Sequence, residues 1–200
     1  VTRSQPSLEA QICNLADEIA YNNHDVDDGL RAGLINLQQL EEVTLFVRYV
    51  EEVRQRYPGL SDRRLIHETV RRMINALVSD LINASAANIA REMPGSLVDV
   101  RSAPALVGFS ADFGRAQQEM KRFLRHHLYQ HYQVLRMANK AQRIIDELFR
   151  AFTGNPALLP PQYLAKDDED QVRRVADYIA GMTDRYAIKE HQRLFAVLES

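Results

Sequence analysis

The longest periodic stretch of the sequence is SDRRLIHETVRRMINALVSDLINASAANIAR, residues 61–91. Its apolar residues recur at steps of three and four from Leu65 to Ile82, which places them along one side of an α-helix. At a rise of about 1.5 Å per residue such a helix is roughly 45 Å long, and Pro94-Gly95 would end it. This stretch predicts that a long helix forms the spine of an all-α fold.

The same spacing predicts further helices on both sides of residues 61–91. They are expected at residues 7–23, 40–57, 112–137, 141–152, 171–185 and 187–198, with a short helical piece framed by Gly29 and Gly33. Residues 96–110 contain Pro104, Gly108 and isolated apolar side chains, so an internal loop is predicted there, or at most a short pair of strands. The chain is expected to form a single helical domain over residues 1–200.

Composition narrows the class of protein. With 46% hydrophobic and 26% charged residues, 200 residues can bury a sizeable core. The net charge of −2 gives no general attraction to nucleic acid or to an acidic membrane. No apolar run approaches the roughly 18 residues that cross a bilayer, and no signal segment is visible, so a cytoplasmic protein without a membrane partner is predicted. Cys13, the single cysteine, lies near Ile12 and Leu15 and is expected to be a small core residue.

The densest polar stretch is LADEIAYNNHD, residues 15–25. On a helix, Asp17, Tyr21 and Asp25 are spaced four residues apart and can point into one cleft. The stretch also fits a plain helix end, because Asn22 to Asp25 are residue types that are frequent where a helix frays into a turn. Spacing alone leaves both interpretations open.

A second stretch, KRFLRHHLYQHY at residues 121–132, combines cations with rings. Lys121, Arg125 and Tyr129 follow helical spacing, so one face of the helix can hold phosphates by charge and a sugar or base by stacking. An exposed basic helix with half-buried aromatic side chains fits the same pattern equally well. A zinc site is not favoured, because His127 and His131 make a set of only two ligands.

Three segments resemble one family in its own order along the chain. LEAQICNLADEIAYNNHDVDDGLRAGLI (8–35), MKRFLRHHLYQHYQV (120–134) and VADYIAGMTDRYAIKEHQRLF (175–195) are similar to the C-terminal half of deoxyguanosinetriphosphate triphosphohydrolase-like proteins of the HD superfamily. The resemblance implies an HD-superfamily-like multi-helix fold. It also implies a metal-dependent hydrolase that converts a deoxynucleoside triphosphate and water into the deoxynucleoside and tripolyphosphate.

The resemblance also implies roles for individual residues. Asp17 matches the last metal ligand of the family. The substrate-binding positions are Tyr21 and Asp25 at the sugar, Lys121 and, more weakly, Arg125 at the phosphates, and Tyr129, Gln130 and His131 at the sugar and base.

The sequence departs from the family in one respect that decides activity. The family's His and His-Asp metal ligands should precede Asp17, but the sixteen preceding residues contain no histidine. The chain, which starts at Val1, is therefore interpreted as a C-terminal fragment that lacks the N-terminal part of the HD core. A divalent metal, Mg²⁺, Mn²⁺ or another transition metal, is expected in the full-length parent, and the fragment itself is expected to bind none and to be inactive.

Partners follow from the same interpretation. A deoxynucleoside triphosphate substrate and a homo-oligomer are expected, since helices that normally cover one another would expose apolar surface. The alternative is a helical module for oligomerisation or for binding single-stranded nucleic acid. In that case phosphates would contact a locally basic group made of Arg115, Lys121, Arg122, Arg125, Arg136, Lys140 and Arg143.

Overall fold

The protein is described by a computed structural model that covers residues 4–164 and 170–196. Within these ranges all regular structure is helical and no strand occurs, which confirms the all-α class. None of the helices in the same ranges is long and apolar enough to cross a membrane.

The chain divides into two compact units, residues 1–131 and 132–200. The first unit contains α1 (Leu8–Arg31), η1 (Gln39–Glu42), α2 (Thr44–Arg56), α3 (Asp62–Glu92), α4 (Leu97–Ser102), α5 (Ala111–Phe123) and the π-helical turn η2 (Leu124–Tyr129). The second contains α6 (Tyr132–Gly154), η3 (Pro156–Leu158), η4 (Pro161–Tyr163), α7 (Gln171–Ala180) and α8 (Asp184–Phe195). Each unit has its own hydrophobic core, and the single domain over residues 1–200 stays a prediction.

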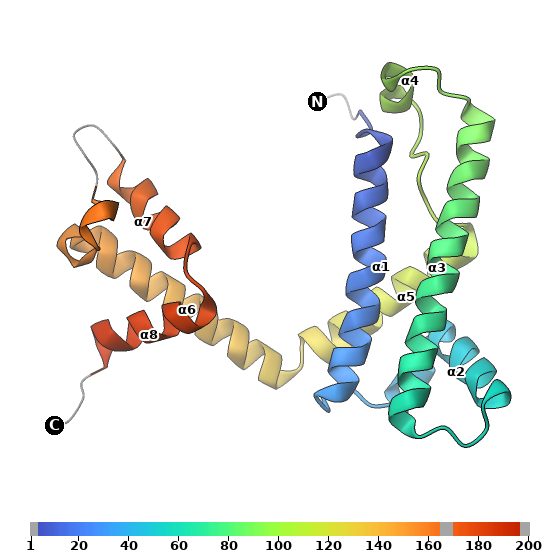
Figure 1. Ribbon diagram of the computed structural model, residues 1–200, viewed down its shortest axis with the longest axis horizontal. Coiled ribbons are helices and arrows are strands. Elements are labelled where there is room, and N and C mark those ends of the chain that lie inside the picture. The colour runs from blue at the N-terminus through green and yellow to red at the C-terminus, as the bar shows by residue number, and fades with distance from the viewer. Residues whose placement is uncertain (1–3, 165–169, 197–200) are drawn as a thin grey trace. The chain divides into compact units, whose positions relative to one another are not determined.

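The first unit is built around α3, the spine that the periodic stretch predicts. α1 and α3 run side by side in opposite directions, and α2 packs against α3 near its start (Figure 1). α3 buries Leu65, Met73, Leu77 and Leu81 in the core that it shares with α1, α2 and α5. It ends at Met93, whose φ of 43° turns the backbone away while its N–H still bonds to Ile89.

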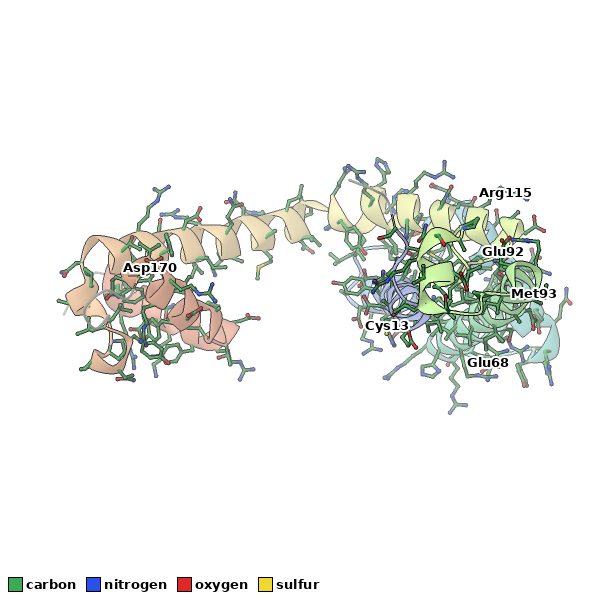
Figure 2. All side chains as sticks on the ribbon, turned by 90° about the horizontal axis from the view of Figure 1, so that it is seen from above. Cys13, Glu68, Glu92, Met93, Arg115 and Asp170 are labelled. Carbon is green, nitrogen blue, oxygen red and sulfur yellow. The ribbon has the colours of Figure 1, made fainter. Side chains whose placement is uncertain are left out.

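α1 differs from its prediction in its length and in its rotation about the helix axis, which decides which residues face the core. It continues through Gly29 to Arg31, so no separate piece lies between Gly29 and Gly33, and the turn comes at Gly33 with a φ of 68°. Its inward residues include Gln11 and Ile19, whereas Ile12 is 49% exposed and Cys13 is exposed (Figure 2). The prediction that Cys13 is a core residue is therefore wrong.

The inward position of Gln11 explains this rotation. Its Oε1 accepts hydrogen bonds from the backbone N–H groups of Leu106 and Val107, both at 3.1 Å. These bonds satisfy buried amides that would otherwise be unpaired, which is costly in an apolar interior. Gln11 therefore takes the inward position that the apolar pattern assigns to Ile12.

The predicted loop at residues 96–110 contains one short helix. Ser96 caps α4 by accepting a hydrogen bond from the N–H of Asp99 at 3.3 Å, a local pairing that the Pro and Gly content did not reveal. Residues 103–110 form no regular structure. They are held instead by side chains of α1 and α3, because Ser85 accepts from Gly108 N at 3.1 Å and Asp80 accepts from Ser110 N at 2.9 Å.

The helix predicted for residues 112–137 is interrupted. α5 ends at Phe123 and passes into the π-helical turn η2, and a turn follows in which Gln130 N bonds to Arg125 O at 3.2 Å and His131 N to Leu128 O at 3.1 Å. α6 then starts at Tyr132 and continues without a break through the region predicted as the separate helix 141–152. Apolar spacing does not register this break, because the residues on both sides of it keep a helical period.

The second unit packs α6 against α7 and α8. Its core consists of Ile144, Leu148, Phe152, Leu159, Val175 and Tyr178. Gly181 ends α7 five residues before its predicted end, and Thr183 caps α8 through the N–H of Tyr186 at 3.3 Å, so α8 starts at Asp184. The last two residues of the predicted helix 187–198 lie outside the described residues.

Candidate functional site

The first group of candidate residues lies on α1. Asp17, Tyr21 and Asp25 follow one another at one-turn intervals; Asp17 and Tyr21 are exposed and Asp25 is half-buried. Because α1 continues to Arg31, residues 22–25 are inside the helix, and Asn22 and Asn23 are buried. The interpretation of this stretch as a frayed helix end is therefore wrong.

The second group lies where α5 passes into the π-helical turn. Lys121 is in the last turn of α5, Arg125 and Tyr129 are in η2, and Gln130 and His131 follow directly. Lys121, Arg125 and Gln130 are exposed, Tyr129 is 39% exposed and His131 is half-buried. π-Helical turns are rare and are often found at functional sites, but the exposure of these cations also fits a plain solvated helix.

Two contacts join the groups. The Tyr129 hydroxyl donates a hydrogen bond to the Asp25 carboxylate, across 104 positions of sequence, and Lys121 Nζ lies 2.7 Å from Glu18 Oε2. α1 and the segment 121–129 are thus joined at two levels, two helical turns apart on α1. Sequence reasoning missed Glu18, although its position beside Asp17 in the polar stretch was a usable signal.

The electrostatics of the Tyr129 to Asp25 contact keep the phenol protonated. Burial raises the pKa of Tyr129 well above its usual value, and the hydrogen bond to Asp25 and the negative charge of that carboxylate raise it further. Tyr129 therefore acts here as a hydrogen-bond donor that fixes Asp25, and not as a base.

The π-helical turn is braced by His127. Its Nδ1 lies 3.3 Å from Gln39 Nε2 and its Nε2 lies 3.2 Å from Glu42 Oε2, so both ring nitrogens face η1. The ring of Phe123 packs on His127 with 4.6 Å between the centroids. His127 is therefore engaged in holding the turn.

Gly29 allows α1 and the π-helical turn to approach closely. A Cβ atom at this position would lie 3.0 Å from Ile35 Cδ1 and 3.2 Å from Leu128 Cδ1. Both are tighter than ordinary carbon contacts. Leu128 precedes Tyr129, so the missing side chain of Gly29 helps to set the position of the tyrosine that reaches Asp25.

The described residues do not make up a metal site. Within them no group of three or more His, Cys, Asp or Glu side chains is placed to hold a metal ion. Asp17 offers one exposed carboxylate, whereas a bound divalent ion takes several ligands at once. The donors among the described residues therefore do not fit a metal centre by themselves.

Three of the basic residues predicted to bind nucleic acid already pair with carboxylates. Arg115 pairs with Asp112, Lys121 with Glu18, and Arg143 with Glu147, the last at 2.7 Å. Four of the seven cations belong to the first unit, at residues 115–125, and three to the second, at residues 136–143. Part of the positive charge is thus already compensated.

Comparison with known proteins gives two kinds of match. The model of the family "phosphohydrolase-associated domain" matches residues 107–193. Proteins named deoxyguanosinetriphosphate triphosphohydrolase-like protein are 61% identical over 96% of this chain in Bordetella pertussis, 57% identical over all of it in Thiobacillus denitrificans, and 59% identical over 97% in Nitrosomonas europaea.

The chain spans about half the length of these curated relatives, from 50% to 53% of each. The matches confirm the resemblance that is carried by the three sequence segments, including its HD-type helical fold.

Proposed function

Because this chain is homologous, over about half of their length, to the deoxyguanosinetriphosphate triphosphohydrolase-like proteins, we propose that the whole protein hydrolyses deoxynucleoside triphosphates. The products are the deoxynucleoside and tripolyphosphate. In this reaction a water oxygen bonds to the α-phosphorus, the bond from that phosphorus to the 5′-oxygen breaks, and the 5′-oxygen takes up a proton.

One observation carries the proposal beyond the comparison. The contact of Tyr129 with Asp25 and the ion pair of Lys121 with Glu18 bring together the two polar stretches that the resemblance assigns to one substrate. Neither contact is needed to fill the hydrophobic core, since neither Tyr129 nor Lys121 belongs to the core cluster of the first unit. A few convergent polar groups are what orients a ligand in a binding site.

The roles of the residues follow from their chemistry. Lys121 and Arg125 supply positive charge for the phosphates. Lys121 must first release Glu18 in order to bind the substrate. Hydrogen bonds between a charged donor and phosphate are stronger than those between neutral groups. Asp25, held by Tyr129, accepts a hydrogen bond from a sugar hydroxyl, and Tyr21 borders the sugar. Gln130 and His131 face the sugar and base, and Asp17 is one of several metal ligands.

The remaining ligands for a Mg²⁺, Mn²⁺ or other transition-metal ion would come from the part of the relatives that this chain does not span. We therefore infer that this chain is the C-terminal portion of the enzyme and that it is inactive alone. Turnover of any deoxynucleoside triphosphate by the isolated chain, with either Mg²⁺ or Mn²⁺ added, would contradict this inference.

The reaction is tested with the full-length protein in ¹⁸O-labelled water. Each of the four deoxynucleoside triphosphates is incubated with Mg²⁺ or Mn²⁺, and products are followed by ³¹P nuclear magnetic resonance. We expect tripolyphosphate that carries one ¹⁸O on a terminal phosphate, because attack occurs at the α-phosphorus. Pyrophosphate, single phosphate, or label on the deoxynucleoside refutes the assignment.

A homo-oligomer is the second part of the proposal. Its support is the exposed apolar side chains of the described residues, among them Ile82 on α3 and Leu135 and Met137 on α6. We expect self-association in sedimentation velocity, and a strictly monomeric profile contradicts it.

The alternative function, a module that binds single-stranded DNA, is less favoured, because three of its seven cations are paired. Absence of salt-dependent DNA binding at low ionic strength would exclude it.

A further inference from the structure

Asn22 lies on α1 between the two contacts that join this helix to α5 and to the π-helical turn. It follows Glu18 by four residues and precedes Asp25 by three, so these side chains project from one face of the helix. Glu18 pairs with Lys121, and Asp25 accepts the hydrogen bond of the Tyr129 hydroxyl. Asn22 therefore lies on the face of α1 that makes both contacts, one helical turn from Glu18.

The amide nitrogen of Asn22 is buried without a partner. The residue is only 6% exposed, and among the described residues its Nδ2 atom donates to no acceptor. A buried donor without an acceptor costs free energy, so such a group in a folded protein calls for an explanation. Asn23, the next residue, differs in this respect, because its Nδ2 donates to the backbone oxygen of Ile19 at 2.7 Å. Asn22 thus carries two N–H groups that the fold does not use.

Glu18 is an acceptor that these N–H groups can reach. Side chains four residues apart on a helix are neighbours, with about 5–6 Å between their Cβ atoms, and amide and carboxylate groups at this spacing form hydrogen bonds. In the structure the Glu18 carboxylate is occupied by Lys121, whose Nζ lies 2.7 Å from Glu18 Oε2. The side chain of Glu18 is 23% exposed, so its negative charge is partly withdrawn from water.

The proposed function requires Lys121 to leave Glu18 when the phosphates bind. A half-buried carboxylate that loses its cation is left with an unfavourable charge, because removing one partner of such a pair costs more than the pair contributes. That cost would weaken substrate binding unless another donor took the place of the lysine.

We propose that Asn22 is a positioning residue that binds Glu18 when Lys121 turns to the substrate. In the free protein the carboxylate pairs with Lys121, and in the substrate complex it accepts a hydrogen bond from Asn22 Nδ2. No proton moves, since the lysine stays charged in both states. This inference rests on the proposed function, because phosphate at Lys121 drives the exchange.

The test is a double-mutant cycle in the full-length protein, measured as KM and kcat for the deoxynucleoside triphosphate that it hydrolyses fastest. Asn22→Leu removes both donors at a similar side-chain volume. We expect KM to rise about tenfold with little change in kcat, because Glu18 is then left unpaired in the complex. In the Glu18→Gln background the same substitution should change KM by less than about twofold, since no charge is left unpaired. An equal rise in both backgrounds overturns the proposal.

Two matched controls use the other buried amides. Asn23→Leu removes a donor that already bonds to Ile19, so we expect lower stability and a change in KM that does not depend on Glu18. Gln117→Leu is the second control, because Gln117 on α5 is also buried without a partner among the described residues, although it is not on the helix that carries Glu18. An effect on KM that depends on Glu18 in either control, as strongly as with Asn22→Leu, overturns the proposal.

A second cycle needs no turnover. Lys121→Met removes the lysine's charge and its donors, and thermal unfolding of the full-length protein is followed with and without Asn22→Leu. We expect Asn22→Leu to lower Tm by about 2–4 °C more in the Lys121→Met background than in the wild type, because it then removes the donor that replaces the lysine. Equal decreases overturn the proposal. Absence of hydrolysis by the full-length protein refutes the proposed function, whereas this cycle still decides whether Asn22 and Glu18 are coupled.

Discussion

The two units of the chain achieve helical packing by different means. In the first unit α3 buries side chains from Leu65 to Ser85, and polar side chains such as Gln11 and Ser85 bind the irregular segment that crosses α1 and α3. In the second unit the core lies against the later half of α6, whereas Leu135 and Met137 near its start are exposed.

This difference shows which unit can hold side chains in fixed positions. A site needs side chains whose positions are set by several independent contacts, and the first unit supplies them through its core, the His127 brace and the close approach at Gly29. The second unit depends on a few large side chains, among them Phe152 and Tyr178, whose rings meet at 5.5 Å. We therefore expect the first unit to carry chemistry and the second to be sensitive to single truncations.

The largest expected effect comes from Asp17→Asn in the full-length protein. We expect turnover to fall roughly a thousandfold or more, because a metal ligand supports several kcal/mol of transition-state stabilisation. The melting temperature should hardly change, since Asp17 is exposed. Asp146→Asn, an equally exposed position in the second unit, is the control and should keep full activity. Wild-type turnover in Asp17→Asn would remove Asp17 from the metal site.

Phe152→Ala tests whether the units unfold separately. Phe152 is fully buried in the small core, and its truncation should cost about 3–5 kcal/mol. Hydrogen exchange followed by mass spectrometry should show loss of protection in α6, α7 and α8, with α1 and α3 retained. Equal loss in both units would mean that they unfold as one body.

Gly29→Ala tests the close approach between α1 and the π-helical turn. We expect a destabilisation of about 1–3 kcal/mol, because the new methyl group overpacks against Ile35 and Leu128. Gly114→Ala in α5 is the matched control, since a Cβ there meets nothing within 4 Å and alanine favours a helix over glycine. Chemical denaturation of both variants provides the measurement, and a stabilised Gly29→Ala protein would contradict the packing argument.

The smallest expected effect is on the stability of the folded protein at acidic pH. The pKa of Glu68 is lowered to about 2 in the folded protein, chiefly by Arg71, so its contribution to stability is present above its unfolded pKa of 4.5 and is lost as pH falls from there toward 2. The stability difference between wild type and Glu68→Gln should therefore shrink over that range. In the second unit, Glu147→Gln should behave in the same direction, since Arg143 lowers the pKa of Glu147. A stability difference between wild type and variant that grows as pH falls would contradict this prediction.

How much the sequence could predict depended on the range of the interactions. The apolar period of residues 61–91 gave α3 nearly to the residue, since that signal is local. The rotation of α1 and the exposure of Cys13 could not be read locally, because they follow from hydrogen bonds between Gln11 and residues about 95 positions away. The break at the π-helical turn was also invisible, because the period continues across it.

In the candidate site, too, local spacing predicted one part and contacts between distant residues determine the other. Helical spacing alone grouped Asp17, Tyr21 and Asp25, and the structure keeps them on one helix. The contact of Asp25 with Tyr129 joins positions 104 residues apart, so no local pattern contained it. Glu18 was missed for a related reason, since its place beside Asp17 in the polar stretch did not show that Lys121, far along the sequence, is its ion-pair partner.

The fork that Gln11 forms with two consecutive amides has a consequence for protein engineering. Residues 103–110 have no regular structure, yet Gln11, Asp80 and Ser85 fix their register, so an added residue would misalign these pairings. By contrast, the exposed turn at Pro58-Gly59 lies away from such pairings, and it is the better place to splice in a fluorescent tag or an epitope.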